Sequence, residues 1–184
     1  PVGRAVEAAT VSGEPAWRCR LAMPAEAVSR YGAPPRVVAT WQFCADRPEA
    51  FLVVDWFDQR ACRIPCAIGC SFVPFLEAGA GWRFDKAGLP VDPRRVVARG
   101  NRRLHAVGEG VAGFDRRKRL RIETLDAPLV APGSPALLDF HQRRPSARSG
   151  IHVVLYNNLW GTNFPLWNEG NARFRFRLLW ENVV

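Results

Sequence analysis

The sequence predicts an all-β protein, an antiparallel β-sandwich with few or no helices. The clearest sign is residues 172–180, Ala-Arg-Phe-Arg-Phe-Arg-Leu-Leu-Trp, in which apolar and arginine side chains alternate. Alternation with a period of two is typical of a strand with one buried face. Short segments rich in Val, Trp and Phe recur along the chain between Gly and Pro turn signals, a pattern typical of sandwiches and barrels.

The strand candidates follow one another closely along the chain. Residues 36–43 and 51–57 are rich in Val, Trp and Phe and flank a turn at Asp46-Arg-Pro-Glu49. Residues 117–125 alternate between apolar and charged side chains. Residues 24–31 are the one helix candidate. The remaining strand candidates are residues 17–22, 70–75, 81–84, 96–99, 104–107, 128–130 and 151–156.

A single sandwich domain spanning residues 1–184 is expected, because this length supports one substantial core and no internal repeat is visible. Residues 1–15 are expected to be disordered or a leftover linker. The chain begins at Pro1 and its only methionine is Met23, which favours the C-terminal part of a longer protein. The sequence contains no apolar run of about eighteen residues, so no membrane partner is expected.

The formal net charge of +9 raises the question of a nucleic-acid partner. The positive charge is almost entirely arginine and is spread along the chain, so we do not expect nucleic acid to be bound. The densest cluster is Arg116-Arg-Lys-Arg-Leu-Arg121. It leaves two interpretations open: a patch that binds phosphate or another polyanion, or the solvated face of a strand whose other face carries Leu120 and Ile122.

No metal or cofactor site is predicted in the chain. The three histidines lie far apart in the sequence. Cys62, Cys66 and Cys70 recur at every fourth position, which is not a common zinc-ligand spacing. We interpret the five cysteines as small buried thiols of a reducing compartment, which favours the cytoplasm.

Residues 155–167, Leu-Tyr-Asn-Asn-Leu-Trp-Gly-Thr-Asn-Phe-Pro-Leu-Trp, combine three amide side chains with flat aromatic rings. Amides form paired hydrogen bonds with hydroxyl groups, and aromatic rings pack against the C–H face of a sugar. The pattern indicates carbohydrate binding by Asn157, Asn158, Trp160 and Asn163. A structural interpretation also stays open, because Asn and Gly stabilise tight turns.

The same block resembles a known family. Tyr156-Asn-Asn-Leu-Trp-Gly-Thr-Asn-Phe-Pro165 is similar to the C-terminal signature of large bacterial and fungal proteins related to glycoside hydrolase family 38, the α-mannosidases. Residues 56–67, Trp-Phe-Asp-Gln-Arg-Ala-Cys-Arg-Ile-Pro-Cys-Ala, resemble the family segment W-F-D-K-x-A-x-R-L-P-E-A. Residues 82–88, 101–107 and 125–133 are similar to further family segments in the same order.

The resemblance implies a C-terminal β-sandwich of the galactose-mutarotase-like type, catalogued as a domain of unknown function, behind a catalytic barrel. It also implies that the zinc ion and the nucleophilic Asp belong to that barrel, so no catalytic residue and no cofactor are expected in this chain. His105 and Arg63 lie within matching segments and are further candidates for substrate contact. Cys66 and Gln59 stand where the family has Glu and Lys, so a carboxylate is lost at Cys66.

The sequence therefore predicts the C-terminal domain of a glycoside-hydrolase-like protein, inactive alone, whose partners are carbohydrate and its own N-terminal catalytic domain. A standalone carbohydrate-binding module and a purely structural interaction domain remain as alternatives. A solvent-exposed Trp in an open groove would favour the module, and a large apolar patch would favour packing on another domain. Trp167 and Trp180 are expected in the core.

Overall fold

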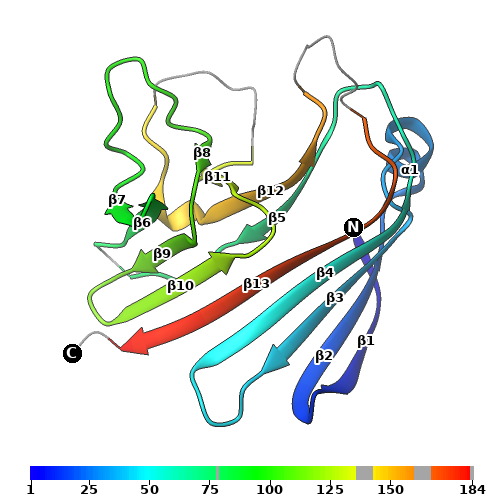
Figure 1. Cartoon of the computed structure of the whole chain (residues 1–184), viewed down its shortest axis with the longest axis horizontal. Helices are drawn as coiled ribbons and strands as arrows, with labels where there is room; N and C mark the ends of the chain where they lie inside the picture. The colour runs from blue at the N-terminus through cyan, green and yellow to red at the C-terminus, as the bar shows by residue number, and fades with distance from the viewer. Residues whose placement is uncertain (78, 136–142, 160–166, 183–184) are drawn as a thin grey trace. The chain divides into compact units, whose positions relative to one another are not determined.

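The structure is a computed structural model that describes residues 1–77, 79–135, 143–159 and 167–182. Within these ranges the protein consists of antiparallel strands with one short α-helix and one 3-10 helix, so the predicted all-β class is confirmed (Figure 1). The chain divides into two compact units. Unit 1 comprises Pro1–Ala67 and Asn157–Arg177, and unit 2 comprises Ile68–Tyr156 and Leu178–Val184.

Unit 1 contains a sheet with the strand order β1-β2-β3-β4-β13. Neighbouring strands from β1 to β4 pair in antiparallel register, and Figure 1 shows them as adjacent arrows from blue to cyan. The predicted strands at residues 36–43 and 51–57 and the predicted helix are confirmed. The elements are β1 (Val2–Val11), β2 (Glu14–Ala22), α1 (Ala25–Tyr31), β3 (Arg36–Phe43), β4 (Glu49–Gln59) and residues 170–177 of β13 (Gly170–Asn182).

Residues 1–15, expected to be disordered or a linker, instead form β1 and the start of β2. The two strands are joined by Ser12 and Gly13, which have φ angles of 51° and 85°. Positive φ at both central residues is the geometry of the tight turn whose twist matches a β-hairpin. The Ser-Gly dipeptide is a recognised turn signal, whereas β1 is rich in alanine and alternates too weakly to be predicted as a strand.

The helix α1 ends at Gly32, which adopts the left-handed conformation with φ 65° and ψ 19°. Glycine is required there because a Cβ atom would collide with the carbonyl oxygen of Arg60. The Arg60 N–H donates to the Gly32 carbonyl at 3.0 Å. The Cys62 thiol donates to the carbonyl of Arg30 at 3.5 Å. The segment after β4 is therefore held against the end of α1.

The core of unit 1 lies on one face of β4 and β13. Trp56 on β4 is 4% exposed, and its ring centroid lies 4.9 Å from that of Phe174 on β13. Phe176 on the same face of β13 is also buried, whereas Arg173 on the opposite face forms an ion pair with a carboxylate of β4. The alternation predicted for residues 172–180 is therefore confirmed.

Two core predictions were wrong. Trp167 and Trp180 are 37% and 40% exposed. Trp167 precedes β13, and Trp180 lies near its last residue. An apolar side chain at the end of a strand continues the alternation of the sequence, but the packing that buries the middle of the strand does not reach it.

Unit 2 is a sandwich of two sheets with strand orders β10-β9-β6-β7 and β5-β12-β11-β8. Phe84 of the first sheet packs edge-on against His105 of the second, with ring centroids 5.4 Å apart. Both sheets supply buried residues to the core between them, such as Ile122 and Val153. The elements are β5 (Ala67–Phe72), β6 (Gly81–Lys86), β7 (Leu89–Val91), β8 (His105–Ala106), β9 (Gly110–Phe114), β10 (Lys118–Thr124), β11 (Leu129–Pro132), η1 (Ala147–Ser149), β12 (Ile151–Asn157) and the end of β13.

Most predicted strands of unit 2 occur, but the agreement is incomplete. The strand predicted at residues 96–99 is wrong, since that segment is irregular and ends in a turn. The strands β7 and β9 were not predicted, because Pro90 in β7 and Gly110 and Gly113 in β9 are residues that usually interrupt strands. In the described part of the chain, no helix has the length and apolar character needed to cross a membrane.

Candidate functional site

Asn158, predicted to contact sugar, is buried in unit 1 with 5% of its surface exposed. Its side-chain N–H groups donate to the carbonyl oxygens of Cys62 at 2.8 Å and Ile64 at 3.1 Å. Its Oδ1 accepts the N–H of Cys66 at 2.6 Å, and its own backbone N–H donates to the Cys66 carbonyl at 3.1 Å. Both side-chain N–H groups of Asn158 are thus used within the chain. This favours the interpretation in which Asn158 stabilises a turn over the one in which it contacts sugar.

Arg63 lies in the segment that Asn158 holds, and its side chain is exposed. Its guanidinium carbon stands 4.6 Å from the centre of the Trp167 ring, a cation–π arrangement. Sequence reasoning paired neither residue with the other. Among the predicted residues, the structure therefore brings Arg63 and Asn158 together, while Trp160 and Asn163 lie outside the described residues.

Asn157 and His105 each carry a buried polar atom without a hydrogen-bond partner among the described residues: Oδ1 of Asn157 and Nε2 of His105. His105 is 7% exposed and lies between the two sheets of unit 2. Burial and the nearby Lys86 ammonium lower the pKa of His105, which keeps the imidazole neutral at pH 7. Substrate contact by either residue stays a prediction.

Cys66 stands at the position where the resembling family has Glu. Its thiol is partly buried and donates to the carbonyl of Tyr31 at 3.9 Å. Burial raises the pKa of Cys66, and burial raises that of Cys70 to about 11. All five cysteines are free thiols, but each is only partly buried, so the expected burial of these side chains is wrong. Across the described ranges, no group of three or more His, Cys, Asp or Glu side chains is arranged to hold a metal ion.

An aromatic row crosses β2 and β3 of unit 1. Trp17 on β2 and Trp41 on β3 are direct partners in the antiparallel register, so their side chains project from the same face of the sheet. Phe43 follows Trp41 by two residues on that face. The rings of Trp41 and Phe43 are stacked, with centroids 6.2 Å apart and planes 12° apart. We refer to Trp17, Trp41 and Phe43 as the aromatic row.

The aromatic row is the uncovered continuation of the unit 1 core. Leu52 on β4 is the register partner of Trp41 and is 4% exposed. Across the sheet from β4 towards β1, exposure rises: Trp17 is 50% exposed, and Val6 on β1 is also exposed on that face. The same apolar face is therefore buried over β4 and open to solvent over β2 and β1.

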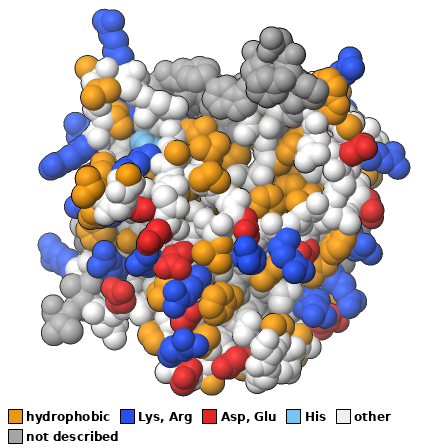
Figure 2. All heavy atoms as spheres, in the orientation of Figure 1, with side chains coloured by type: hydrophobic (Ala, Val, Ile, Leu, Met, Phe, Trp, Pro, Cys, Tyr) orange, Lys and Arg blue, Asp and Glu red, His pale blue; other side chains and the backbone are white. Residues whose placement is uncertain are grey.

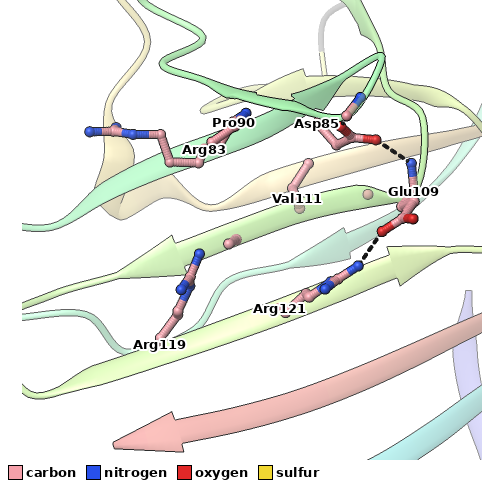
Figure 3. Close-up of a pocket in the computed structure, with 10 residues that line it drawn as sticks. Arg83, Asp85, Pro90, Glu109, Val111, Arg119 and Arg121 are labelled. Atoms are coloured by element: carbon pink, nitrogen blue, oxygen red, sulfur yellow. Dashed lines mark hydrogen bonds and ion pairs between the residues drawn. The ribbon is translucent and has the colours of Figure 1, made fainter. Parts of the chain in front are cut away.

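A second candidate site is a cleft of about 240 Å³ on the outer face of the first sheet of unit 2 (Figure 3). Its floor is formed by the small residues Gly110 and Ala112 of β9. Ala112 pairs with Arg83 of β6 on one side and with Arg121 of β10 on the other. The hollow exists because a short side chain lies between two long ones in the same cross-strand row. Figure 2 shows positive and negative side chains intermingled around β9 and β10.

Sequence reasoning missed the aromatic row and most of the cleft. The sequence contains a signal for each: Trp41 and Phe43 alternate within a predicted strand, and residues 116–121 form a basic cluster. The alternation predicted there is confirmed, since Leu120 and Ile122 are buried and Arg119 and Arg121 lie on the opposite, outer face. The register that brings β6, β9 and β10 together is not readable from the local sequence.

Comparison with protein-family models and with curated proteins finds no match for this chain. Solved structures do match. An α-mannosidase from Enterococcus faecalis superposes with a TM-score of 0.60 at 12% identity, covering 97% of this chain and 22% of that one. A glycosyl hydrolase family 38 protein from Enterococcus faecalis matches with a TM-score of 0.54 at 13% identity, with the same coverage of 97% and 22%.

A galactose 1-epimerase from Lactobacillus acidophilus matches with a TM-score of 0.56 at 9% identity, covering 97% of this chain and 66% of that one. Identities this low show a shared fold and no more. The chain spans about a fifth of the length of the α-mannosidase, 22%. The protein is therefore similar in fold to a galactose 1-epimerase and to part of family 38 α-mannosidase structures.

Proposed function

We propose that the protein is a carbohydrate-binding domain of a longer glycoside-hydrolase-like protein. The observation that carries this proposal is the fold match, in which 97% of the chain superposes on 22% of an α-mannosidase. A galactose 1-epimerase shares the fold as well. Both of these proteins act on sugars according to their names, and the first is several times longer than this chain.

The aromatic row supports the sugar-binding part of the proposal. A pyranose ring presents a flat face of C–H groups, which packs against an aromatic ring and loses contact with water. Trp17 offers an indole that is half exposed, beside the stacked pair of Trp41 and Phe43. Trp41 and Phe43 stack on each other, so these two rings lose little side-chain freedom when a ligand packs on them.

The hydrogen-bonded corner formed by Asn158 and residues 62–66 also supports the proposal. The amide network fixes the segment of residues 62–66, and this segment presents Arg63 beside Trp167. Asn158 acts there as a positioning residue. Arg63 and Trp167 supply hydrogen-bond donors and an exposed ring, which are the groups that sugars require. Contact between this corner and a sugar, together with Trp160 and Asn163, remains part of the proposal.

Replacing Trp17 with alanine is expected to weaken saccharide binding about tenfold or more. The loss of roughly 60 Å² of stacked apolar surface corresponds to about 1.5 kcal/mol. The measurement is isothermal titration of the chain with an oligosaccharide chosen from a panel that includes α-mannosides and galactosides. Circular dichroism of the variant checks that the sheet is retained.

The matched control is Trp180→Ala, because Trp180 has a similar exposed fraction of 40% but lies outside the aromatic row. This variant is expected to bind saccharide as the unmodified protein does. If no saccharide in the panel binds, the proposal fails and the structural interaction domain is the better account, with the open apolar face covered by another part of a longer protein. Equal losses in both tryptophan variants would also contradict the role of the aromatic row.

A further inference from the structure

We propose that the cleft of unit 2 binds the anionic group of an acidic saccharide, that is, a sugar carrying a carboxylate, sulfate or phosphate. This inference rests on the proposed function and narrows its ligand class. The cleft is separate from the aromatic row, which belongs to unit 1. Three arginines line the cleft together with Asp85 and Glu109.

The two ends of the cleft differ in charge. Figure 3 shows Arg121 pointing towards Glu109 at one end, with Asp85 above them. Arg121 forms an ion pair with Glu109, and its Nε lies 3.2 Å from Glu123. Two carboxylates therefore offset the positive charge of Arg121. Figure 3 shows Arg83 and Arg119 at the opposite end, on the left of the view.

The guanidinium charges at this second end are only loosely offset. Arg119 lies 3.8 Å from Glu181, and both side chains are about half exposed, so this ion pair is weak. Arg83 lies 4.0 Å from Asp92. The Asp92 carboxylate is engaged more closely by Arg94, whose Nη2 and Nε approach it at 2.8 and 3.0 Å. That contact lowers the pKa of Asp92 to about 2. The negative charge of Asp92 is therefore offset mainly by Arg94 and less by Arg83.

Arg83 is also held in place before any ligand arrives. Its Nη1 donates to the carbonyl of Trp82 at 3.0 Å, and its guanidinium stands 4.9 Å from the centre of the Phe114 ring. The Phe114 ring packs directly on Gly81. A side chain at this position would collide with the ring, because a Cβ atom on Gly81 would lie 2.6 Å from it. A guanidinium fixed in this way loses little freedom when it binds an anion.

The donor set fits a carboxylate or another oxyanion, because guanidinium groups donate paired hydrogen bonds to adjacent oxygens. The carboxylates at the other end argue against a long polyanion, which would meet Glu109 and Glu123. They suit hydroxyl groups instead. Asp85 is already occupied by the N–H groups of Gly88 and Glu109, at 2.7 Å each, so Glu109 is the hydroxyl acceptor of the cleft.

The test compares matched ligands on the whole chain by isothermal titration: a neutral disaccharide, its glucuronate, sulfate and phosphate derivatives, and inorganic sulfate alone. The anionic derivatives are expected to bind about tenfold more tightly than the neutral sugar, and Arg119→Gln and Arg83→Gln are each expected to remove that difference. Arg30→Gln is the control, because Arg30 lies on α1 outside the cleft and pairs with Glu26.

The three derivatives distinguish a carboxylate, a sulfate and a phosphate as the bound group. The derivative that binds most tightly identifies which of these groups the cleft prefers. The inference is overturned if neutral and anionic sugars bind equally, if Arg119→Gln keeps the preference, or if inorganic sulfate binds as tightly as the sulfated sugar. Arg119→Lys is the control for misfolding. It keeps the positive charge but not the paired hydrogen-bond donors, so a partial loss of the preference for anionic sugars is expected. Neutral sugar that still binds through Trp17 shows that the proposed function stands even when this inference fails.

Discussion

Replacing Asn158 with leucine is expected to lower the free energy of unfolding by about 3 kcal/mol. The change removes the hydrogen bonds to Cys62, Ile64 and Cys66 and leaves two carbonyl groups and one N–H of a partly buried segment without partners. Each unsatisfied buried group costs about 1–3 kcal/mol, and partial access to water reduces the sum. The measurement is urea denaturation followed by circular dichroism.

The neighbouring Asn157 provides the matched control. Its Oδ1 is buried without a hydrogen-bond partner among the described residues, so Asn157→Leu removes no bond of that atom. This variant is expected to stay within about 1 kcal/mol of the unmodified protein. Equal destabilisation by the two variants would contradict the view that Asn158 is the residue that fixes the segment of residues 62–66.

Replacing Glu49 with glutamine is expected to destabilise the protein by about 2 kcal/mol at pH 7. Glu49 is 6% exposed and accepts a hydrogen bond from Nε of Arg177 at 2.6 Å. Removing the charge leaves the guanidinium without its closest carboxylate, a change that costs several kcal/mol when both groups are buried. The Arg177 side chain is 35% exposed, so solvent screening reduces the effect.

The pH dependence of this variant is a second part of the same prediction. The hydrogen bond from Arg177 and the positive charges of Arg177 and Arg47 lower the pKa of Glu49 below its ordinary value of 4.5. The ionised carboxylate therefore contributes stability above pH 4.5, and this contribution is lost as the pH falls through the lowered pKa of the folded protein. The difference between the unmodified protein and Glu49→Gln is expected to narrow below about pH 4.5.

Asp55 offers the control for the ion pair. It joins β4 to β13 as Glu49 does, with Nε of Arg173 at 2.7 Å, but the Arg173 side chain is 67% exposed. Asp55→Asn is expected to cost less than about 1 kcal/mol, because exposed ion pairs contribute little. The account would be wrong if Asp55→Asn were as costly as Glu49→Gln, or if the Glu49→Gln difference did not change with pH.

The strands with strong local signals could be predicted from the sequence. Residues 172–180 and 117–125 alternate, and the structure buries the apolar residues in the middle of each strand, such as Phe176 and Ile122. The strand β9 could not be predicted in the same way. Its residues Gly110 and Gly113 are there because neighbouring strands approach closely: a Cβ atom on Gly113 would lie 2.9 Å from the Trp82 ring. That requirement is set by the neighbouring strand β6, so it cannot be read from the sequence of β9 alone.

The candidate site shows the same limit. The predicted residues Asn158 and Arg63 are brought together, because Asn158, which follows β12, is hydrogen-bonded to the segment of residues 62–66 that follows β4. The amide itself is used by the backbone, which the residue type could not reveal. The aromatic row depends on the pairing of Trp17 with Trp41, and this pairing is set by the register of two strands.

The most direct test of sugar binding on the open face of unit 1 is a titration of the ¹⁵N-labelled chain with saccharide, followed through its tryptophan indole N–H signals. The proposal predicts that the signals of Trp17 and Trp41 move together with increasing saccharide and saturate, whereas that of Trp180 stays in place. Signals of Trp17 and Trp41 that do not move at saturating saccharide, or changes confined to other tryptophans, would contradict the proposal.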